Sequence, residues 1–325
     1  MNAPTQVDSV AAALAARLPG RVERGVPSAK LTTYRCGGPL AVVVRAESEP
    51  DLHAVAGVLQ AADVPMLVVG RGSNLLVADR GFAGVALVLA GEFEQLDVDL
   101  NPAGAGAPEV RAGGAVALPV LARRAGAAGI AGLEFYVGIP GSVGGAVRMN
   151  AGGHGAQTDD VILGARVFDF GDGRVRDKTR AQLGLGYRHS KLDPRSIVLA
   201  ATFAGRPDDP AAIAARIDEI VRWRREHQPG GQNAGSVFTN PPDDSAGRLI
   251  EAAGCKGLRV GGAVVSEKHA NFFVADPGAL AADVYALIEL VRVRVHEATG
   301  VQLETELHLI GFEPMSGIFT NAEAS

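Results

Sequence analysis

Cysteine and aromatic residues are scarce in this sequence. Only 2 of its 325 residues are cysteine, and phenylalanine, tryptophan and tyrosine together make up 5%. Cys36 and Cys255 are far apart, and neither belongs to a Cys-x-x-Cys pair. This pattern argues against a zinc site and against a disulfide framework, and it is typical of proteins in a reducing cytosol. We therefore expect no metal site.

Long apolar runs and a strongly basic charge are also missing. No apolar stretch approaches the roughly 20 residues that span a bilayer, and the first residues lack the basic start and apolar core of a signal peptide. The formal net charge is −5 with both signs interspersed, so no basic patch favours nucleic-acid binding. We expect a cytoplasmic protein that binds neither membranes nor nucleic acids.

The common nucleotide-binding and hydrolase signatures are incomplete or absent. The segment Gly70-Arg-Gly-Ser-Asn74 lacks the third glycine of the dinucleotide fingerprint, and no G-x-x-x-x-G-K-[ST] loop occurs. No G-x-S-x-G elbow is present either. These absences exclude the usual Rossmann and P-loop nucleotide sites and argue against a serine hydrolase of the elbow type.

Glycine, by contrast, is abundant, with 42 residues, and it is concentrated in a nearly uncharged run from Gly138 to Gly153. Successive backbone N–H groups in a tight turn form a concave, partly positive nest for phosphate oxygens. The alternative for such a run is an ordinary surface loop. The segment Gly70–Asn74 echoes the run directly after a predicted strand. Two such turns favour one long, doubly phosphorylated ligand held between them.

Hydrophobic periodicity predicts both helices and strands along the chain. The predicted helices are 10–18, 50–59, 116–126, 144–150, 211–227, 245–253 and 280–299. The predicted strands are 41–45, 66–69, 85–89, 110–112, 166–170, 174–176, 197–203, 236–239, 272–275 and 301–310. The polar, proline-containing segment 204–210 is typical of a linker, so we place the main domain boundary near residue 207.

Five segments, in order along the chain, carry a resemblance to a known family. They are Val69-Gly-Arg-Gly-Ser-Asn-Leu-Leu-Val77, Gly138-Ile-Pro-Gly-Ser-Val-Gly-Gly-Ala146, Leu185-Gly-Tyr-Arg-His-Ser190, Ala234-Gly-Ser-Val-Phe-Thr-Asn-Pro241 and Leu303-Glu-Thr-Glu-Leu-His-Leu-Ile-Gly311. Together they resemble the UDP-N-acetylenolpyruvoylglucosamine reductase family over roughly residues 30–311.

The resemblance implies an α+β protein with a two-subdomain FAD-binding domain of the vanillyl-alcohol-oxidase (PCMH) type, followed by a smaller α+β substrate-binding domain. The expected limits are 1–207 for the FAD-binding domain, with subdomains at about 20–91 and 92–207, then 208–312 for the substrate-binding domain and 313–325 for a flexible tail.

The resemblance also implies a two-step reduction that uses FAD and NADPH. A hydride passes from NADPH to FAD and then to UDP-N-acetyl-3-O-(1-carboxyvinyl)glucosamine, which yields UDP-N-acetylmuramate for peptidoglycan synthesis. One site that serves both substrates in turn explains why the sequence lacks a separate nicotinamide-binding Rossmann unit. We expect the protein to act as a monomer.

Three residues match the family's catalytic positions. Arg188 would meet the negative charge that develops on the substrate carboxylate, for which a guanidinium fork is suited. Ser236 would protonate the second carbon, and Glu306 would act beside the arginine. Glu304 is the rival of Glu306, but the family's glutamate directly precedes the segment that begins here at Leu307. Without the resemblance, these residues would be interpreted as a surface arginine, a turn serine and an exposed strand carboxylate.

The remaining matches concern binding of the flavin and of the sugar nucleotide. The flavin positions are Gly70, Arg71, Gly72, Ser73, Asn74, Gly138, Ile139, Pro140, Gly141, Ser142, Gly144, Gly145 and Asn150. The substrate positions are His154, Tyr187, Arg224, Asn240 and Lys256. For each substrate position the alternative is a solvated polar residue.

The sequence departs from the family pattern in two places. Some relatives insert a loop after the Arg188 motif whose tyrosine folds over the diphosphate, but no tyrosine occurs between Ser190 and Arg222. The chain therefore resembles the subgroup without that loop. His227 stands where relatives often have lysine, so a permanent charge is replaced by one that titrates near neutral pH.

Two other functions compete with the reductase. The first is an FAD-dependent oxidase of the same superfamily with another substrate. Such oxidases often hold FAD covalently through histidine or cysteine, and neither glycine segment contains one, although His154 lies at the edge of the second. The other is a non-catalytic nucleotide-binding module, which would not need Arg188, Ser236 and Glu306 together.

Overall fold

The computed structural model describes residues 5–100 and 106–313. The chain divides into unit 1, formed by Met1–Val26, Leu40–Ser73 and Ala83–His227, and unit 2, formed by Pro27–Pro39, Asn74–Phe82 and Gln228–Ser325. Two short N-terminal segments thus belong with the C-terminal unit. Of the predicted tail 313–325, only residue 313 lies within the described residues.

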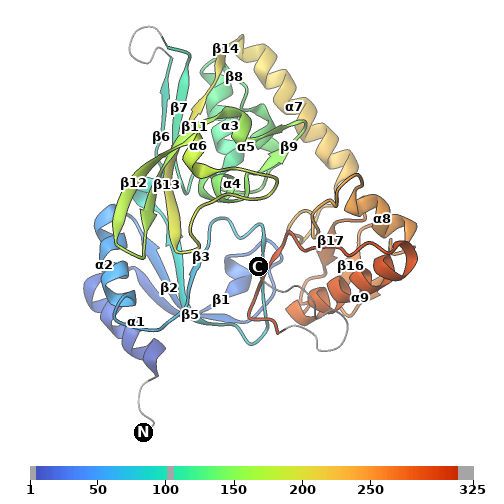
Figure 1. Ribbon diagram of the computed structural model, residues 1–325, viewed down its shortest axis with the longest axis horizontal. Helices are drawn as coiled ribbons and strands as arrows, with labels where there is room; N and C mark the ends of the chain where they lie inside the picture. Colours follow the sequence, from blue (N-terminus) through green and yellow to red (C-terminus); the bar gives the residue numbers. More distant parts are fainter. Residues whose placement is uncertain (1–4, 101–105, 314–325) are drawn as a thin grey trace. The chain divides into compact units, whose positions relative to one another are not determined.

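The first sheet of unit 1 has four strands in the order β1-β2-β5-β3 (Figure 1). The strands are β1 (Val22–Pro27), β2 (Pro39–Ala46), β5 (Phe82–Leu89) and β3 (Met66–Val68), and the helices packed on it are α1 (Gln6–Arg17) and α2 (Glu49–Leu59). Helix α2 starts at a carboxylate cap, because the backbone N–H of Ser48 donates to Asp51 Oδ2 (3.1 Å). Its buried residues Leu52, Val55 and Leu59 recur at helical spacing and face the sheet core.

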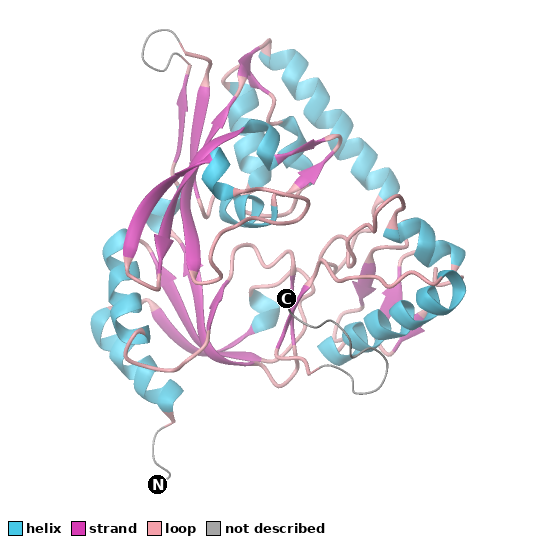
Figure 2. Ribbon diagram, in the orientation of Figure 1, coloured by secondary structure: helices cyan, strands magenta, loops and turns pink. Residues whose placement is uncertain are grey.

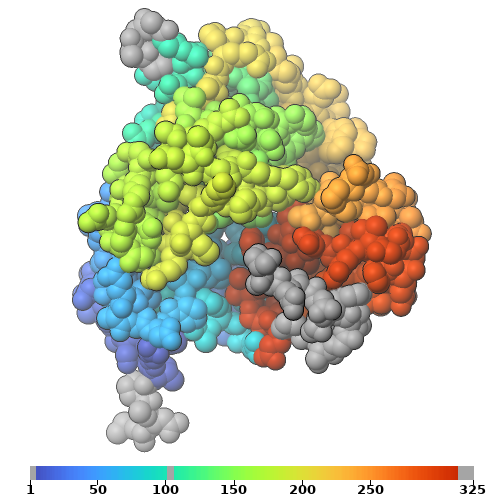
Figure 3. Space-filling model, in the orientation of Figure 1, coloured from blue at the N-terminus to red at the C-terminus, as the bar shows by residue number. Residues whose placement is uncertain are grey.

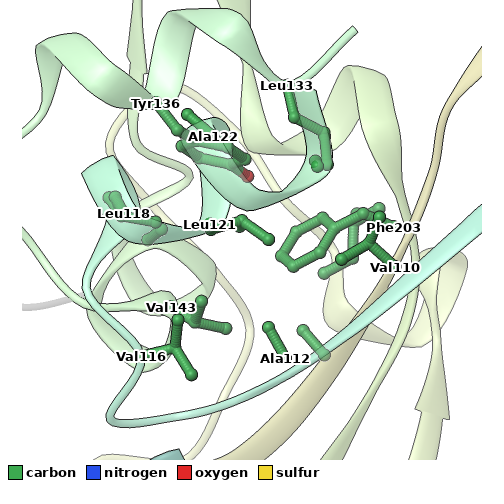
Figure 4. Close-up of a cluster of buried hydrophobic side chains, with 14 of the residues drawn as sticks. Val110, Ala112, Val116, Leu118, Leu121, Ala122, Leu133, Tyr136, Val143 and Phe203 are labelled. Atoms are coloured by element: carbon green, nitrogen blue, oxygen red, sulfur yellow. The ribbon is translucent and has the colours of Figure 1, made fainter. Parts of the chain in front are cut away.

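The second sheet of unit 1 has five strands in the order β12-β11-β13-β7-β6 (Figure 2). They are β12 (Arg174–Thr179), β11 (Ile162–Asp169), β13 (Ser196–Ala204), β7 (Glu109–Gly113) and β6 (Leu96–Asp99), all paired antiparallel. Figure 4 shows the core beside this sheet, where Phe203 of β13 and Val110 of β7 lie near Leu133 and Tyr136. The buried Tyr136 hydroxyl donates to Thr158 Oγ1 (3.1 Å), which satisfies its polar end. In space-filling form, β11 and β12 (yellow-green) make a continuous outer surface (Figure 3).

Helices and short elements complete unit 1. They are η2 (Gly91–Glu94), α3 (Leu118–Ala127), β8 (Ile130–Ala131), η4 (Glu134–Gly138), α4 (Val143–Met149), β9 (Gly152–Gly153), β10 (Ala156–Gln157), α5 (Thr158–Val161), α6 (Arg180–Leu183), β14 (Arg206–Pro207) and α7 (Pro210–His227). Ile213 and Ile217 of α7 are buried in the same core as α3, so the long helix belongs to unit 1. The units therefore divide after α7 rather than near residue 207, and the functional domain limits stay a prediction.

Unit 2 packs two helices against a three-stranded sheet. Its elements are η1 (Ser28–Lys30), α8 (Ala246–Ala252), β15 (Arg259–Val260), β16 (Ala263–Val265), β17 (Phe273–Ala275) and α9 (Ala281–Thr299), together with the parallel pair β4 (Leu75–Val77) and β18 (His308–Ile310). Helix α9 buries Val284, Leu287, Ile288 and Val291. The carboxylate of Asp79 accepts hydrogen bonds from the first backbone N–H groups of this helix, at 3.0 and 2.9 Å.

Most predicted elements are confirmed, but the strand predicted over 236–239 is wrong, and the one predicted over 301–310 is confirmed only for its last three residues. The segment 236–239 makes only isolated bridges, at Ser236 and Phe238, and the strand predicted over 301–310 is reduced to β18. The reason is a change of partner: Thr305 bridges to Phe238, whereas residues from His308 onward pair with β4. No single neighbouring segment pairs with the whole of 301–310, so a long β-ladder does not form.

Candidate active site

The first glycine turn of the sequence follows β3 and touches the second glycine run within unit 1. A Cβ atom added to Gly70 would lie 2.7 Å from Ser142 Oγ, and one added to Gly141 would lie 3.7 Å from Ser73 Oγ. Gly72 has φ +62°, a conformation that glycine adopts without strain. The two predicted nests are therefore neighbours, and glycine at position 70 permits their close approach.

The turn also offers hydrogen-bond donors. Among the residues that the structure describes, none accepts a hydrogen bond from the backbone N–H of Gly70, Arg71 or Ser73. Gly70 and Arg71 are exposed. Free, accessible N–H groups in a glycine turn suit the oxygens of a diphosphate, so these residues fit the diphosphate of FAD.

Several residues of the second glycine run make hydrogen bonds within unit 1. Ser142 is the N-cap of α4 and accepts from the backbone N–H of Gly145 (3.4 Å). The N–H of Gly144 donates to Gly114 O (2.9 Å), and a Cβ there would lie 3.1 Å from that same oxygen. Gly144 thus lets α4 pack closely against the chain at Gly114. The predicted flavin contacts of Gly138, Ile139, Pro140, Gly141, Ser142, Gly144 and Gly145 stay predictions.

Asn150 ends α4 in the left-handed conformation, with φ +42°, and is fully buried. Its side-chain amide donates to Gly186 O (2.9 Å) and Gln157 Oε1 (3.2 Å), and its Oδ1 accepts from the Asp159 N–H (2.8 Å). The side chain is therefore used to hold neighbouring loops, while the predicted role in flavin binding is untested.

Arg188 lies on a tight turn. Gly186 and His189 exchange two backbone hydrogen bonds (3.0 and 3.2 Å), and Tyr187 and Arg188 occupy the tip. Arg188 has φ +54°, which is unfavourable for a residue with a side chain. Its guanidinium lies 5.0 Å from the centre of the Tyr187 ring, and that ring is 53% exposed. This is a cation–π contact at the surface of unit 1.

His154 and Arg224, two predicted substrate contacts, lie close together in unit 1. The His154 ring meets Trp223 edge to face (4.9 Å, 84°), and Trp223 stacks on His227 (4.6 Å, 10°). Burial lowers the pKa of His154, and the charge of Arg224 lowers it further. Burial also lowers the pKa of the Arg224 guanidinium. This stack could not be predicted from the sequence, because Trp223 belongs to no motif.

Unit 2 brings Ser236 and Glu306 onto adjacent segments. The backbone N–H of Glu306 donates to Val237 O (2.8 Å). The side chain of Asn74 donates to Glu306 O (3.0 Å), and His308 donates its N–H to Asn74 O (3.1 Å). Two of the three predicted catalytic residues and the last residue of the first glycine turn are thus joined within one unit.

Asn271 was not expected from the sequence, but it holds this arrangement. It is buried, its Oδ1 accepts from the Phe238 N–H (2.9 Å), and its Nδ2 donates to Phe238 O (2.8 Å). Its own carbonyl accepts from the Val237 N–H (2.9 Å). These bonds fix the two residues that directly follow Ser236.

The other predicted substrate contacts of unit 2 make structural bonds. Asn240 accepts at Oδ1 from the Ala246 N–H at the start of α8 (3.0 Å). Lys256 pairs with Glu251 (2.8 Å) and is half-buried. Burial lowers the pKa of His269, and the charge of Lys256 lowers it further. Lys256 and His269 therefore lie near one another.

Further findings concern metal binding, membrane helices and a groove outside the candidate site. Within residues 5–100 and 106–313, no cluster of three histidine, cysteine or acidic side chains could hold a metal ion, and no described helix has the length and apolarity to cross a membrane. A groove of about 420 Å³ crosses β7, β11, β12 and β13 and is lined by charged residues such as Arg111, Arg166 and Lys178. None of the predicted site residues lines it.

Comparison with known proteins identifies the two parts of the chain. Residues 39–178 match a family model described as an FAD binding domain, and residues 227–310 match the C-terminal domain of UDP-N-acetylenolpyruvoylglucosamine reductase. These matches confirm the predicted fold class and the FAD-binding domain.

Relatives match over almost the whole length. The chain is 43% identical to the UDP-N-acetylenolpyruvoylglucosamine reductase of Methylorubrum populi, over 98% of this chain and 100% of that protein. It is 45% identical to that of Paramagnetospirillum magneticum, over 91% of this chain and 94% of that protein. The crystal structure of the Thermus caldophilus enzyme is 38% identical, with a TM-score of 0.76, and covers 89% of this chain and 99% of its own. The chain belongs to the UDP-N-acetylenolpyruvoylglucosamine reductase family.

Proposed function

We propose that this protein is an NADPH-dependent flavoenzyme that reduces the enolpyruvyl ether of UDP-N-acetylglucosamine to UDP-N-acetylmuramate, a peptidoglycan precursor. The observation that carries the proposal is the 43% identity that extends over 98% of the chain and 100% of the relative. We further propose that it works in the cytoplasm as a monomer and belongs to the subgroup without the tyrosine loop, since residues between Ser190 and Arg222 include no tyrosine.

The first glycine turn and the second glycine run would hold FAD. The N–H groups of Gly70, Arg71 and Ser73, which have no acceptor among the described residues, are suited to its diphosphate, and Gly70 lies close to Ser142 of the second run. When bound, FAD would take a hydride from NADPH and deliver it to the substrate double bond.

Three side chains would serve the sugar half of the reaction. The Arg188 guanidinium would stabilise the negative charge that develops on the substrate carboxylate, with Glu306 beside it. The Ser236 hydroxyl would give its proton to the carbon that does not receive the hydride. A serine hydroxyl is a weak acid, so it can act only on a strongly basic carbanion centre and only if its segment is held in place. The bonds of Asn271 to Phe238 support that requirement.

The remaining polar residues would bind the sugar nucleotide. We assign this role to His154, Tyr187 and Arg224 of unit 1 and to Asn240 and Lys256 of unit 2. In the subgroup without the tyrosine loop, the diphosphate lacks the tyrosine that folds over it in other relatives.

The decisive experiment follows the two half-reactions of the FAD-loaded protein without oxygen. NADPH should bleach the flavin absorbance, and the UDP-enolpyruvyl sugar should restore it. If oxygen restores the flavin quickly while the sugar nucleotide has no effect, the protein is an oxidase. A protein that cannot be loaded with FAD would contradict both functions.

Ser236→Ala separates the two steps. Flavin reduction by NADPH should stay near normal, whereas reoxidation by the sugar should slow by about 10²–10⁴-fold, the usual contribution of a positioned proton donor. Ser245→Ala, which removes a serine that caps α8, is the matched control and should leave both rates unchanged. Equal slowing of both half-reactions in Ser236→Ala would remove that serine from the proton-donor role.

A further inference from the structure

Arg148 makes an unusual set of contacts for a residue without an assigned role. It lies near the end of α4, and its guanidinium donates to three backbone carbonyls: Leu192 (2.8 Å), Asp193 (3.0 Å from each of two nitrogens) and Ser196 (2.6 Å). One side chain thus fixes the segment that runs from the Arg188 turn into β13.

The same end of α4 holds the other flank of the Arg188 turn. Asn150, two residues after Arg148, donates to Gly186 O (2.9 Å) and accepts from the Asp159 N–H (2.8 Å). Gly186 is the first residue of the turn. The Arg188 turn is therefore anchored before it by Asn150 and after it by Arg148.

The turn needs such anchors, because its conformation is unfavourable. Arg188 adopts φ +54°, and a left-handed residue with a side chain persists only where its surroundings fix it. The turn itself has two backbone hydrogen bonds, and Tyr187 at its tip is half exposed.

We propose that Arg148 is a positioning residue for Arg188, which it holds through the 190–196 segment so that the Arg188 guanidinium meets the substrate carboxylate in a fixed place. The inference rests on the proposed function, since it takes Arg188 as the group that stabilises charge on the substrate. A displacement of about 1 Å in such a group can slow a reaction about 10²-fold.

Arg148→Lys tests the proposal with the least disturbance. Lysine keeps the charge, but its single ammonium cannot reach three carbonyls as the planar guanidinium does. In the FAD-loaded protein under anaerobic conditions, reoxidation of the flavin by the UDP-enolpyruvyl sugar should slow by about 10–100-fold. Reduction by NADPH should change by less than about threefold, and the absorbance spectrum of the bound flavin should stay the same. Arg123→Lys, at an exposed position of α3, is the matched control and should leave both rates unchanged.

The Arg188→Ala background distinguishes positioning from a general structural role. If Arg148 acts through Arg188, Arg148→Lys should cause no further slowing once Arg188 is alanine. Additive slowing, or equal slowing of both half-reactions in the single variant, would overturn the inference. If Arg188→Ala alone leaves reoxidation unchanged, the proposed role of Arg188 fails first. If Arg188→Ala slows it and Arg148→Lys does not, only the inference fails.

Discussion

The two units hold their proposed functional residues in different ways. In unit 1, the turn with Arg188 is tied by long polar side chains, since Arg148 and Asn150 both donate to backbone carbonyls around it. In unit 2, Ser236 and Glu306 lie on segments joined mainly through their backbones, as in the bond from Glu306 N–H to Val237 O.

Because of this difference, we expect substitutions in the two units to affect different properties of the protein. A side chain that ties an exposed turn can be removed while the sheet behind it stays paired. A backbone pairing has no single side chain to remove, but a buried side chain that supports it, Asn271, bonds to the buried residue Phe238. We therefore expect changes in unit 1 to affect activity first and changes at Asn271 to affect stability first.

The largest stability effect is expected for Asn271→Leu. The N–H and C=O of Phe238 would both lose their partners while buried, and each such loss costs about 1–3 kcal/mol. The free energy of unfolding should fall by about 3 kcal/mol or more. Urea unfolding followed by far-UV circular dichroism measures this, with Trp223 fluorescence as a separate reporter of unit 1.

Asn233→Leu is the control for that comparison. Asn233 is also an asparagine of unit 2. Its amide makes long bonds to Gly230 O and Gly231 O (3.4 and 3.3 Å), its Oδ1 accepts from the Gly235 N–H (3.1 Å), and the residue is only half-buried. It should cost less than about 1 kcal/mol, as surface positions usually do. If Asn271→Leu costs no more than Asn233→Leu, then the backbone pairing holds the Ser236 segment without side-chain support.

The sequence predicted the helices and central strands because their apolar periods are strong. Helix α9 buries Val284, Leu287, Ile288 and Val291 at helical spacing, and its type follows from that pattern. The prediction over 236–239 was wrong, and the one over 301–310 too long, because an apolar run shows that a segment is buried but does not show which neighbour it pairs with. There the neighbours change after a few residues.

For the candidate site too, some features could be predicted from the sequence and others could not. The glycine turns could be located from local composition, and their contact at Gly70 and Ser142 agrees with one shared ligand. The supports of the site could not be predicted. Arg148 lies inside the glycine-rich run, yet its acceptors begin 44 residues later, and Asn271 serves a residue 33 positions earlier. Only the fold brings such pairs together.

Arg188→Gly should give a smaller effect on stability and one of opposite sign. A left-handed residue with a side chain costs about 1–2 kcal/mol, and the greater freedom of glycine in the unfolded chain offsets about 0.4–1 kcal/mol of the gain. The free energy of unfolding should therefore rise by up to about 1.6 kcal/mol, while sugar reduction falls by about 10²-fold or more. Urea unfolding and the anaerobic reoxidation rate measure the two changes.

Arg35→Gly is the matched change in unit 2, since Arg35 has φ +52° and is exposed. It should raise stability by a similar amount without the loss of sugar reduction. A loss of stability in Arg188→Gly would mean that the arginine side chain contributes more to unit 1 than its strained backbone costs.

The smallest effect concerns pH and His154. Burial, followed by the charge of Arg224, lowers the pKa of this histidine in the folded protein below its ordinary value of 6.5. The unfolded chain therefore binds a proton more readily than the folded one, so this contribution to stability is complete above pH 6.5 and is lost as the pH falls toward the folded pKa. His154→Gln should flatten the pH dependence of the unfolding midpoint of unit 1 in that window, as followed by Trp223 fluorescence. His269→Gln should leave the pH dependence of that midpoint unchanged. It should instead flatten the pH dependence of the unfolding midpoint measured by circular dichroism, because His269, whose pKa is also lowered, lies in unit 2. If both variants alter both midpoints equally, the two units unfold together and the contrast between them does not extend to their stability.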